Sequence, residues 1–143
     1  MQFLAVAFIA AGIIGYEILL IRLYAITQWH HFAFMVISIA LLGFGVSGTA
    51  LSLVRPWAIR RLALVWPANA FLFGLCAVAG FALAQRLTVN PMELAWNPAL
   101  FARVGLIYLL LMLPFFFGAN CIGLTFAAFG RSSGRIYRFD LVG

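Results

Sequence analysis

Four long apolar runs constrain this sequence of 143 residues more than any other feature. A helix that crosses a bilayer needs about 20 consecutive, mostly apolar residues. The runs cover residues 3–27, 32–54, 62–84 and 104–129. They lack the period-two alternation of barrel strands. We therefore predict an all-α polytopic transmembrane bundle of four spans.

The composition supports this class and excludes others. Hydrophobic residues make up 66% of the chain and charged residues 8%, and the mean hydropathy is +1.14, far above that of an ordinary soluble domain. The net charge of +6 is the balance of nine arginines and three acidic residues, and the arginines are scattered at the ends of apolar runs. This distribution indicates contact with anionic lipid headgroups and no nucleic-acid partner.

The distribution of arginine predicts the orientation in the membrane. The two basic segments contain Arg55, Arg60 and Arg61, and Arg131, Arg135 and Arg138. Both should be cytoplasmic by the positive-inside rule, and the even number of spans between them allows this. We therefore expect a multi-pass protein of the cytoplasmic membrane with its N-terminus inside. The first run has no basic leader and no cleavage pattern, so we interpret it as a retained helix.

Two segments outside the spans have a readable pattern. A short interfacial helix is predicted over residues 91–96, and an Asn-Pro pair at Asn97 marks the approach to the fourth span. Pro114 should kink that span. Residues 131–143 are interpreted as a polar hinge followed by the start of a further, incomplete segment, so the sequence looks cut short.

Glu17 and Arg22 are the charges inside the first span. They are five positions apart, about 140° around a helix, so they do not face each other as an i, i+4 pair would. Arg22 can extend to the outer interface. Glu17 must be protonated, paired with another helix or exposed to water. Two interpretations stay open, a proton or substrate relay and a structural contact between helices.

Other polar residues in or near the spans are Asn69, Asn120 and His31. We expect a hydrogen bond between Asn69 and Asn120, on the third and fourth spans, with a structural role. His31 follows another histidine, and adjacent histidines in a helix diverge by about 100° and do not readily share a metal. An interfacial turn is therefore favoured over a metal or haem site.

The stretch "GFGVSG" in the second span matches the dinucleotide pattern G-x-G-x-x-G, but no strand precedes it and no acidic residue follows about 20 positions later. Small residues here instead favour close helix packing, with Gly45, Gly48 and Ser52 on one face. Cys76 and Cys121 lie inside spans and form no metal-binding pattern. No catalytic constellation, metal site or cofactor is predicted in this chain.

Two stretches resemble a known family. "GIIGYEILLIRL" is similar to the first membrane helix of the spermidine synthase-like integral membrane proteins of bacteria, where small residues lead into Tyr-Glu and an Arg-Leu follows. "GRIYRFDLVG" is similar to the segment after the fourth helix of that family, and the Gly-rich second span also fits. The matching positions are Gly12, Gly15, Tyr16, Glu17, Arg22 and Leu23, and Tyr137, Asp140, Leu141 and Gly143.

The resemblance implies further helices and a soluble Rossmann-like domain similar to polyamine aminopropyltransferases, which use decarboxylated S-adenosylmethionine. None of that domain is present, so no catalytic residue is carried over. The resemblance marks only Glu17, Arg22 and Asp140 as family-motif positions in this sequence, and it assigns no role to them.

Three functions follow as hypotheses. The first is a membrane-embedded anchor or scaffold for a soluble catalytic domain outside this chain. The second is a small accessory subunit of a larger membrane complex, and the third is part of a transporter with Glu17 in a polar path. The expected partners are the lipid bilayer, its anionic headgroups, and other membrane subunits or the protein's own missing domain.

Overall fold

A computed structural model describes residues 2–27, 31–86, 98–129 and 141. Within these ranges the chain forms four α-helices and no strand. The helices are α1 (Gln2–Thr27), α2 (His31–Arg60), α3 (Leu62–Arg86) and α4 (Pro98–Ala128). Each is long and apolar enough to cross a membrane. The predicted all-α fold with four spans is confirmed.

Two helices extend beyond the predicted spans. The predicted second span ends at residue 54, but α2 continues through Pro56 to Arg60. A proline removes only one backbone hydrogen bond, here the one to Ser52, and an arginine in the last turn interacts favourably with the helix dipole. The predicted fourth span begins at residue 104, whereas α4 begins at Pro98, a residue that suits the first helical position.

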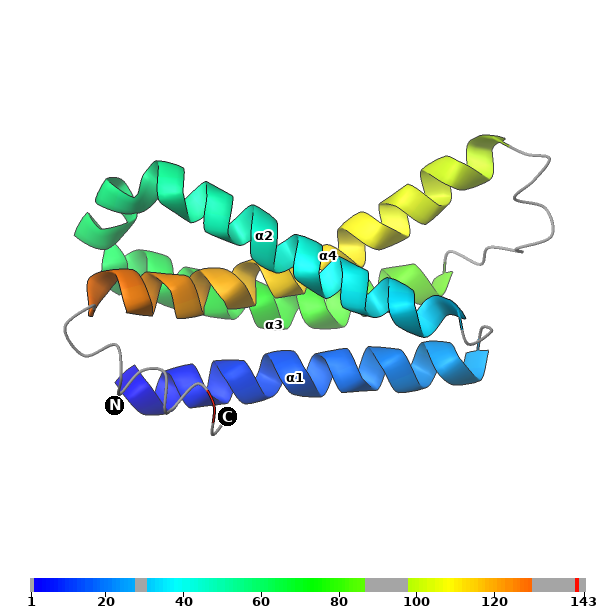
Figure 1. The fold of residues 1–143 in the computed structure, drawn as a ribbon, viewed down its shortest axis with the longest axis horizontal. Helices are drawn as coiled ribbons and strands as arrows, with labels where there is room; N and C mark the ends of the chain where they lie inside the picture. The colour runs from blue at the N-terminus through cyan, green and yellow to red at the C-terminus, as the bar shows by residue number, and fades with distance from the viewer. Residues whose placement is uncertain (1, 28–30, 87–97, 130–140, 142–143) are drawn as a thin grey trace.

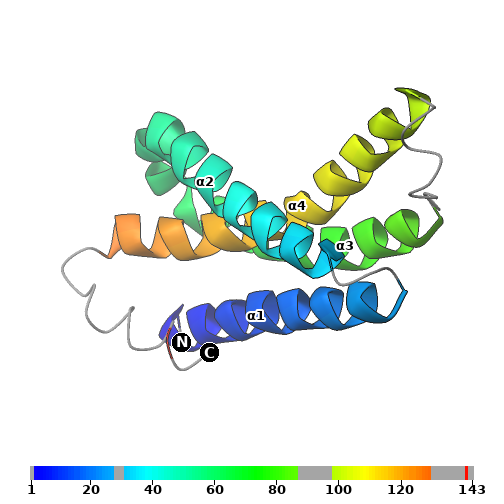
Figure 2. The same cartoon turned by 45° about the vertical axis from the view of Figure 1, so that its right-hand side comes forward.

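α4 occupies the centre of the arrangement (Figures 1 and 2). It packs against both α2 and α3, while α1 packs against α2 and α4. The start of α1, the junction between α2 and α3, and the end of α4 lie at the same end of the molecule, on the left of Figure 1. Since Arg55, Arg60 and Arg61 are here, we call this the arginine end.

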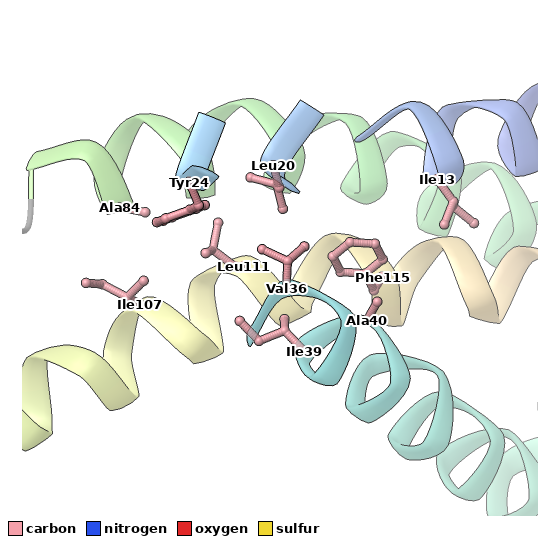
Figure 3. Packing of buried hydrophobic residues seen from close by; sticks show 10 residues of the cluster. All are labelled: Ile13, Leu20, Tyr24, Val36, Ile39, Ala40, Ala84, Ile107, Leu111 and Phe115. Atoms are coloured by element: carbon pink, nitrogen blue, oxygen red, sulfur yellow. The ribbon is translucent and has the colours of Figure 1, made fainter. Parts of the chain in front are cut away.

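The buried core lies where α1, α2 and α4 meet, and Ala84 joins it from α3 (Figure 3). Leu20, Val36, Leu111 and Phe115 are completely buried. The full cluster consists of Ile13, Leu20, Tyr24, Val36, Ile39, Ala40, Ala84, Ile107, Leu111 and Phe115. Many other large apolar side chains point outwards, as expected where the solvent is lipid and not water.

α4 bends in its middle, and its first half points away from the line of its second half (Figure 1). Pro114 lies inside the helix at this level and is fully buried. A proline has no N–H for the carbonyl four residues earlier, here Leu110, and its ring crowds that carbonyl. The bend agrees with the kink predicted from the sequence.

Two glycines let neighbouring helices approach this bend. A Cβ placed on Gly80 of α3 would lie 2.8 Å from the Leu110 carbonyl oxygen, the acceptor that Pro114 leaves without its helical donor. A Cβ on Gly43 of α2 would lie 2.7 Å from Cβ of Phe115 and 3.2 Å from the Met112 carbonyl oxygen. Both contacts involve atoms fixed to the α4 backbone, so they can be relieved only by moving the helices apart.

These contacts give a matched prediction. Gly43→Ala should lower the free energy of unfolding by about 1–3 kcal/mol, because the added methyl group overpacks the contact with α4. Gly45→Ala, two residues away, has nothing within 4 Å of the added methyl group. It should leave stability unchanged or raise it by up to about 1 kcal/mol through helix propensity. Unfolding in mixed detergent micelles measures both, and equal effects of the two substitutions would contradict the packing described here.

Candidate functional site

Three helices share a chain of hydrogen bonds on the arginine-end side of the bend. Ser47 Oγ on α2 donates to Asn120 Oδ1 on α4 over 2.8 Å. Asn120 Nδ2 donates to Asn69 Oδ1 on α3 over 3.4 Å, and Asn69 Nδ2 donates to the Val65 carbonyl oxygen over 2.8 Å. The predicted bond between Asn69 and Asn120 is confirmed, and Ser47 extends it to a third helix.

A second polar connection joins α3 to α4 nearer the arginine end. The indole N–H of Trp66 lies 3.1 Å from Thr125 Oγ1 and 3.2 Å from the Cys121 carbonyl oxygen. Thr125 Oγ1 donates to the same carbonyl over 2.8 Å, and the Cys121 thiol donates weakly to the Trp66 carbonyl oxygen over 3.7 Å. These groups satisfy one another and leave no free donor directed at a ligand.

Both connections have a structural explanation. In hydrocarbon a polar side chain without a partner costs free energy, and a bond across helices removes that cost. Ser47 and Thr125 are buried, and the two asparagines are partly buried. These interior polar groups on α2, α3 and α4 therefore hold the described helices together.

Glu17 lies on the core-facing stripe of α1. Ala10, Ile13, Leu20 and Tyr24 are buried, and their spacing of three, four and seven residues from position 17 places Glu17 on the same side of the helix. Its side chain is half-buried. Among the described residues its carboxylate has no hydrogen-bond or ion-pair partner. The structural contact and the relay both remain hypotheses for this residue.

Tyr16, directly before Glu17, is the second polar group of α1 at this depth. Its ring stacks at a tilt against Phe115, with 5.4 Å between ring centroids. Its hydroxyl is buried and has no hydrogen-bond partner in the described part of the chain. α1 therefore presents two adjacent polar side chains that α2, α3 and α4 do not satisfy.

The remaining residues that the sequence analysis singled out do not join these polar groups in the described part of the structure. Arg22 is exposed near the end of α1, as expected for a side chain that reaches the interface. His31 begins α2, but its side chain is outside the described part of the structure. Asp140, the interfacial helix over 91–96 and all but one residue of the hinge over 131–143 also lie outside the described residues.

The face with Gly45, Gly48 and Ser52 does not pack against the described helices of this chain. A Cβ on either glycine meets nothing within 4 Å, and Ser52 is exposed and donates to the Thr49 carbonyl oxygen of its own helix over 2.7 Å. The intramolecular contact is made instead by Gly43 and Ser47, an i, i+4 pair. α2 therefore has two stripes of small residues. The stripe with Gly43 and Ser47 faces α4, where Ser47 has its hydrogen-bond partner Asn120.

Metal chemistry finds no support in the described residues, since no group of three or more His, Cys, Asp or Glu side chains comes together there. Cys76 and Cys121 are both free thiols. Comparisons with protein-family models, with curated proteins and with solved structures give no match to this chain.

Ser47, the Trp66–Thr125 pair and the buried hydroxyl of Tyr16 were not singled out as interacting groups from the sequence. The spacing of Gly43 and Ser47 is a small-xxx-small pattern, which could have indicated the packed face of α2. Trp66 and Thr125 are 59 positions apart, and no local pattern pairs them.

Asn120 gives the sharpest test of the polar network. Asn120→Leu removes the bonds to Ser47 and Asn69, and measured bonds between membrane helices average about 0.6 kcal/mol and reach about 1.7. We expect the free energy of unfolding to fall by about 1–2 kcal/mol in micelles. Ser38→Ala, which removes only a bond to the Phe34 carbonyl on an exposed face, should change it by less than about 0.5 kcal/mol. Comparable losses for both substitutions would show that the network contributes nothing specific.

Proposed function

We propose that this chain is the membrane-embedded anchoring domain of a spermidine synthase-like integral membrane protein in the bacterial cytoplasmic membrane. The observation that carries this proposal is how the interior polar groups are used. Ser47, Asn69 and Asn120 bond to one another across three helices. A bundle whose polar side chains bond to one another is stable as a unit, so it is suited to holding an attached domain or partner in place.

The arginine end supports an anchoring role on the cytoplasmic side. Arg55, Arg60 and Arg61 are exposed where α2 meets α3, and the described chain also reaches this end at the last turn of α4 (Figure 1). Under the positive-inside rule this end faces the cytoplasm. A domain attached after α4 would then lie on the side where soluble polyamine substrates occur, in line with the resemblance to the aminopropyltransferase-like proteins.

An accessory subunit of a larger membrane complex is the second candidate. The exposed face of α2 with Gly45, Gly48 and Ser52 favours it, because small residues allow another helix to approach closely. A transporter with Glu17 in a polar path is the third. It has less support, because no further carboxylate or basic group among the described residues joins Glu17.

The anchoring proposal predicts a fixed orientation. A fluorescent protein fused after Gly143 should be bright and remain in the membrane fraction after washing at high pH. A phosphatase fused there should be inactive, while one inserted between α1 and α2 should be active, because it would lie outside the cytoplasm. Release of the fusion by the wash, or an active phosphatase after Gly143, would contradict the proposal.

Access of water to position 17 separates anchoring from transport. In a chain with Cys76→Ala and Cys121→Ala, Glu17→Cys should not react with a membrane-impermeant thiol reagent, because an anchor needs no aqueous path at mid-membrane. Gln28→Cys, between α1 and α2 and outside the apolar span, is the control and should react. Labelling of position 17 at a rate close to that of position 28 would favour the transporter.

A further inference from the structure

A cavity of about 440 Å³ lies at the arginine end between α1, α3 and α4. Its lining comes from Ala5 on α1, from Leu62, Ala63, Trp66 and Pro67 on α3, and from Thr125 and Phe129 at the end of α4. The lining thus combines the small side chains of Ala5, Ala63 and Pro67 with the bulky rings of Trp66 and Phe129. The volume is far larger than the roughly 30 Å³ that one water molecule occupies in the liquid.

The chemistry of the lining selects an apolar occupant. Trp66 and Thr125 carry the polar side-chain atoms of the cavity wall, and both are engaged between α3 and α4, with 3.1 Å between the indole nitrogen and the hydroxyl oxygen. Thr125 also donates to the Cys121 carbonyl. Neither side chain has a free donor for a polar ligand. The cavity wall is therefore suited to contact with a hydrocarbon chain.

Two arginines lie next to the N-terminus of α3, the helix that supplies most of the cavity lining. Arg61 directly precedes Leu62 of the lining, and its carbonyl oxygen accepts the N–H groups of Leu64 and Val65, both over 2.9 Å. These bonds fix Arg61 to the first turn of α3. Its guanidinium lies 5.9 Å from the ring centroid of Trp57, an exposed tryptophan of the type found at headgroup level. Arg60, the last residue of α2, is also exposed.

We propose that this cavity binds one acyl chain of an anionic phospholipid, whose phosphate is held by Arg60 and Arg61. The apolar walls accept the chain, and Arg60 at the end of α2 and Arg61 directly before α3 supply positive charge that is complementary to the headgroup of that lipid. Basic residues beside a space between membrane helices are a known way of binding anionic headgroups. The site depends on the fold alone, so its failure would leave the anchoring proposal untouched.

The charge contribution is tested with the full chain in detergent, by native mass spectrometry with phosphatidylglycerol and with phosphatidylcholine of the same acyl chains. Wild type should bind phosphatidylglycerol more tightly. Arg61→Gln should weaken phosphatidylglycerol binding by about fivefold, and adding Arg60→Gln should weaken it by a similar factor again. Arg22→Gln, near the opposite end of α1, is the matched control and should leave the affinity unchanged.

The cavity contribution is tested by filling it. Ala63→Phe should weaken binding of both lipids at least tenfold, whereas Ala79→Phe, at an exposed position on the same helix outside the cavity lining, should have no effect. If Ala63→Phe does not fold, Ala5→Leu fills the cavity from α1 and should weaken both lipids in the same way. Unchanged affinity in the folded cavity-filling variant, or an equal loss for Arg22→Gln and Arg61→Gln, would overturn the proposal and indicate lipid held only by surface charge.

Discussion

Pro114 interrupts the backbone hydrogen bonds of α4 in the middle of the span, and the arrangement of the other helices depends on that interruption. In hydrocarbon an exposed carbonyl without a donor is costly, so a freed carbonyl has to be covered by protein. The Leu110 carbonyl is covered by Gly80, where the absence of a side chain lets the α3 backbone come close. Contact of this kind also permits a weak Cα–H to oxygen interaction. The defect in α4 thus determines where α3 crosses it.

The same bend organises the other side of α4. Phe115, the residue after the proline, is completely buried, and its ring lies near those of Tyr16 on α1 and Phe44 on α2. Gly43 sits against its Cβ. Five residues further along α4, Asn120 bonds to α2 and α3. Backbone proximity at the bend therefore brings the helices close enough for short polar side chains to reach one another.

The sequence was sufficient to predict what depends on local pattern. Run length predicted the four spans, Pro114 predicted the bend in α4, and the two asparagines of α3 and α4 predicted a bond between them. The sequence was not sufficient where the outcome depends on which surfaces of the helices pack together. The sequence placed Gly45 of "GFGVSG" on the packing face, yet among the described residues it is Gly43 that meets α4. Likewise the second apolar run ends at residue 54, yet α2 continues through Pro56 to Arg60, because one lost bond does not stop a helix whose neighbouring bonds persist.

The distribution of satisfied and unsatisfied polar groups distinguishes α1 from its neighbours. On α2 the exposed hydroxyls of Ser38, Thr49 and Ser52 bond to carbonyls of their own helix, so that face can meet lipid without a polar cost. On α1 the buried hydroxyl of Tyr16 has no described partner, and Glu17 beside it has none either. Two adjacent polar residues of α1 therefore lack the partners that the described polar groups inside α2, α3 and α4 give one another. The Tyr16 hydroxyl lies inside the bundle, so only a group within the bundle could satisfy it. Glu17 is half-buried, so a donor brought to its carboxylate would remove a larger polar cost than one brought to the already bonded hydroxyls on the exposed face of α2.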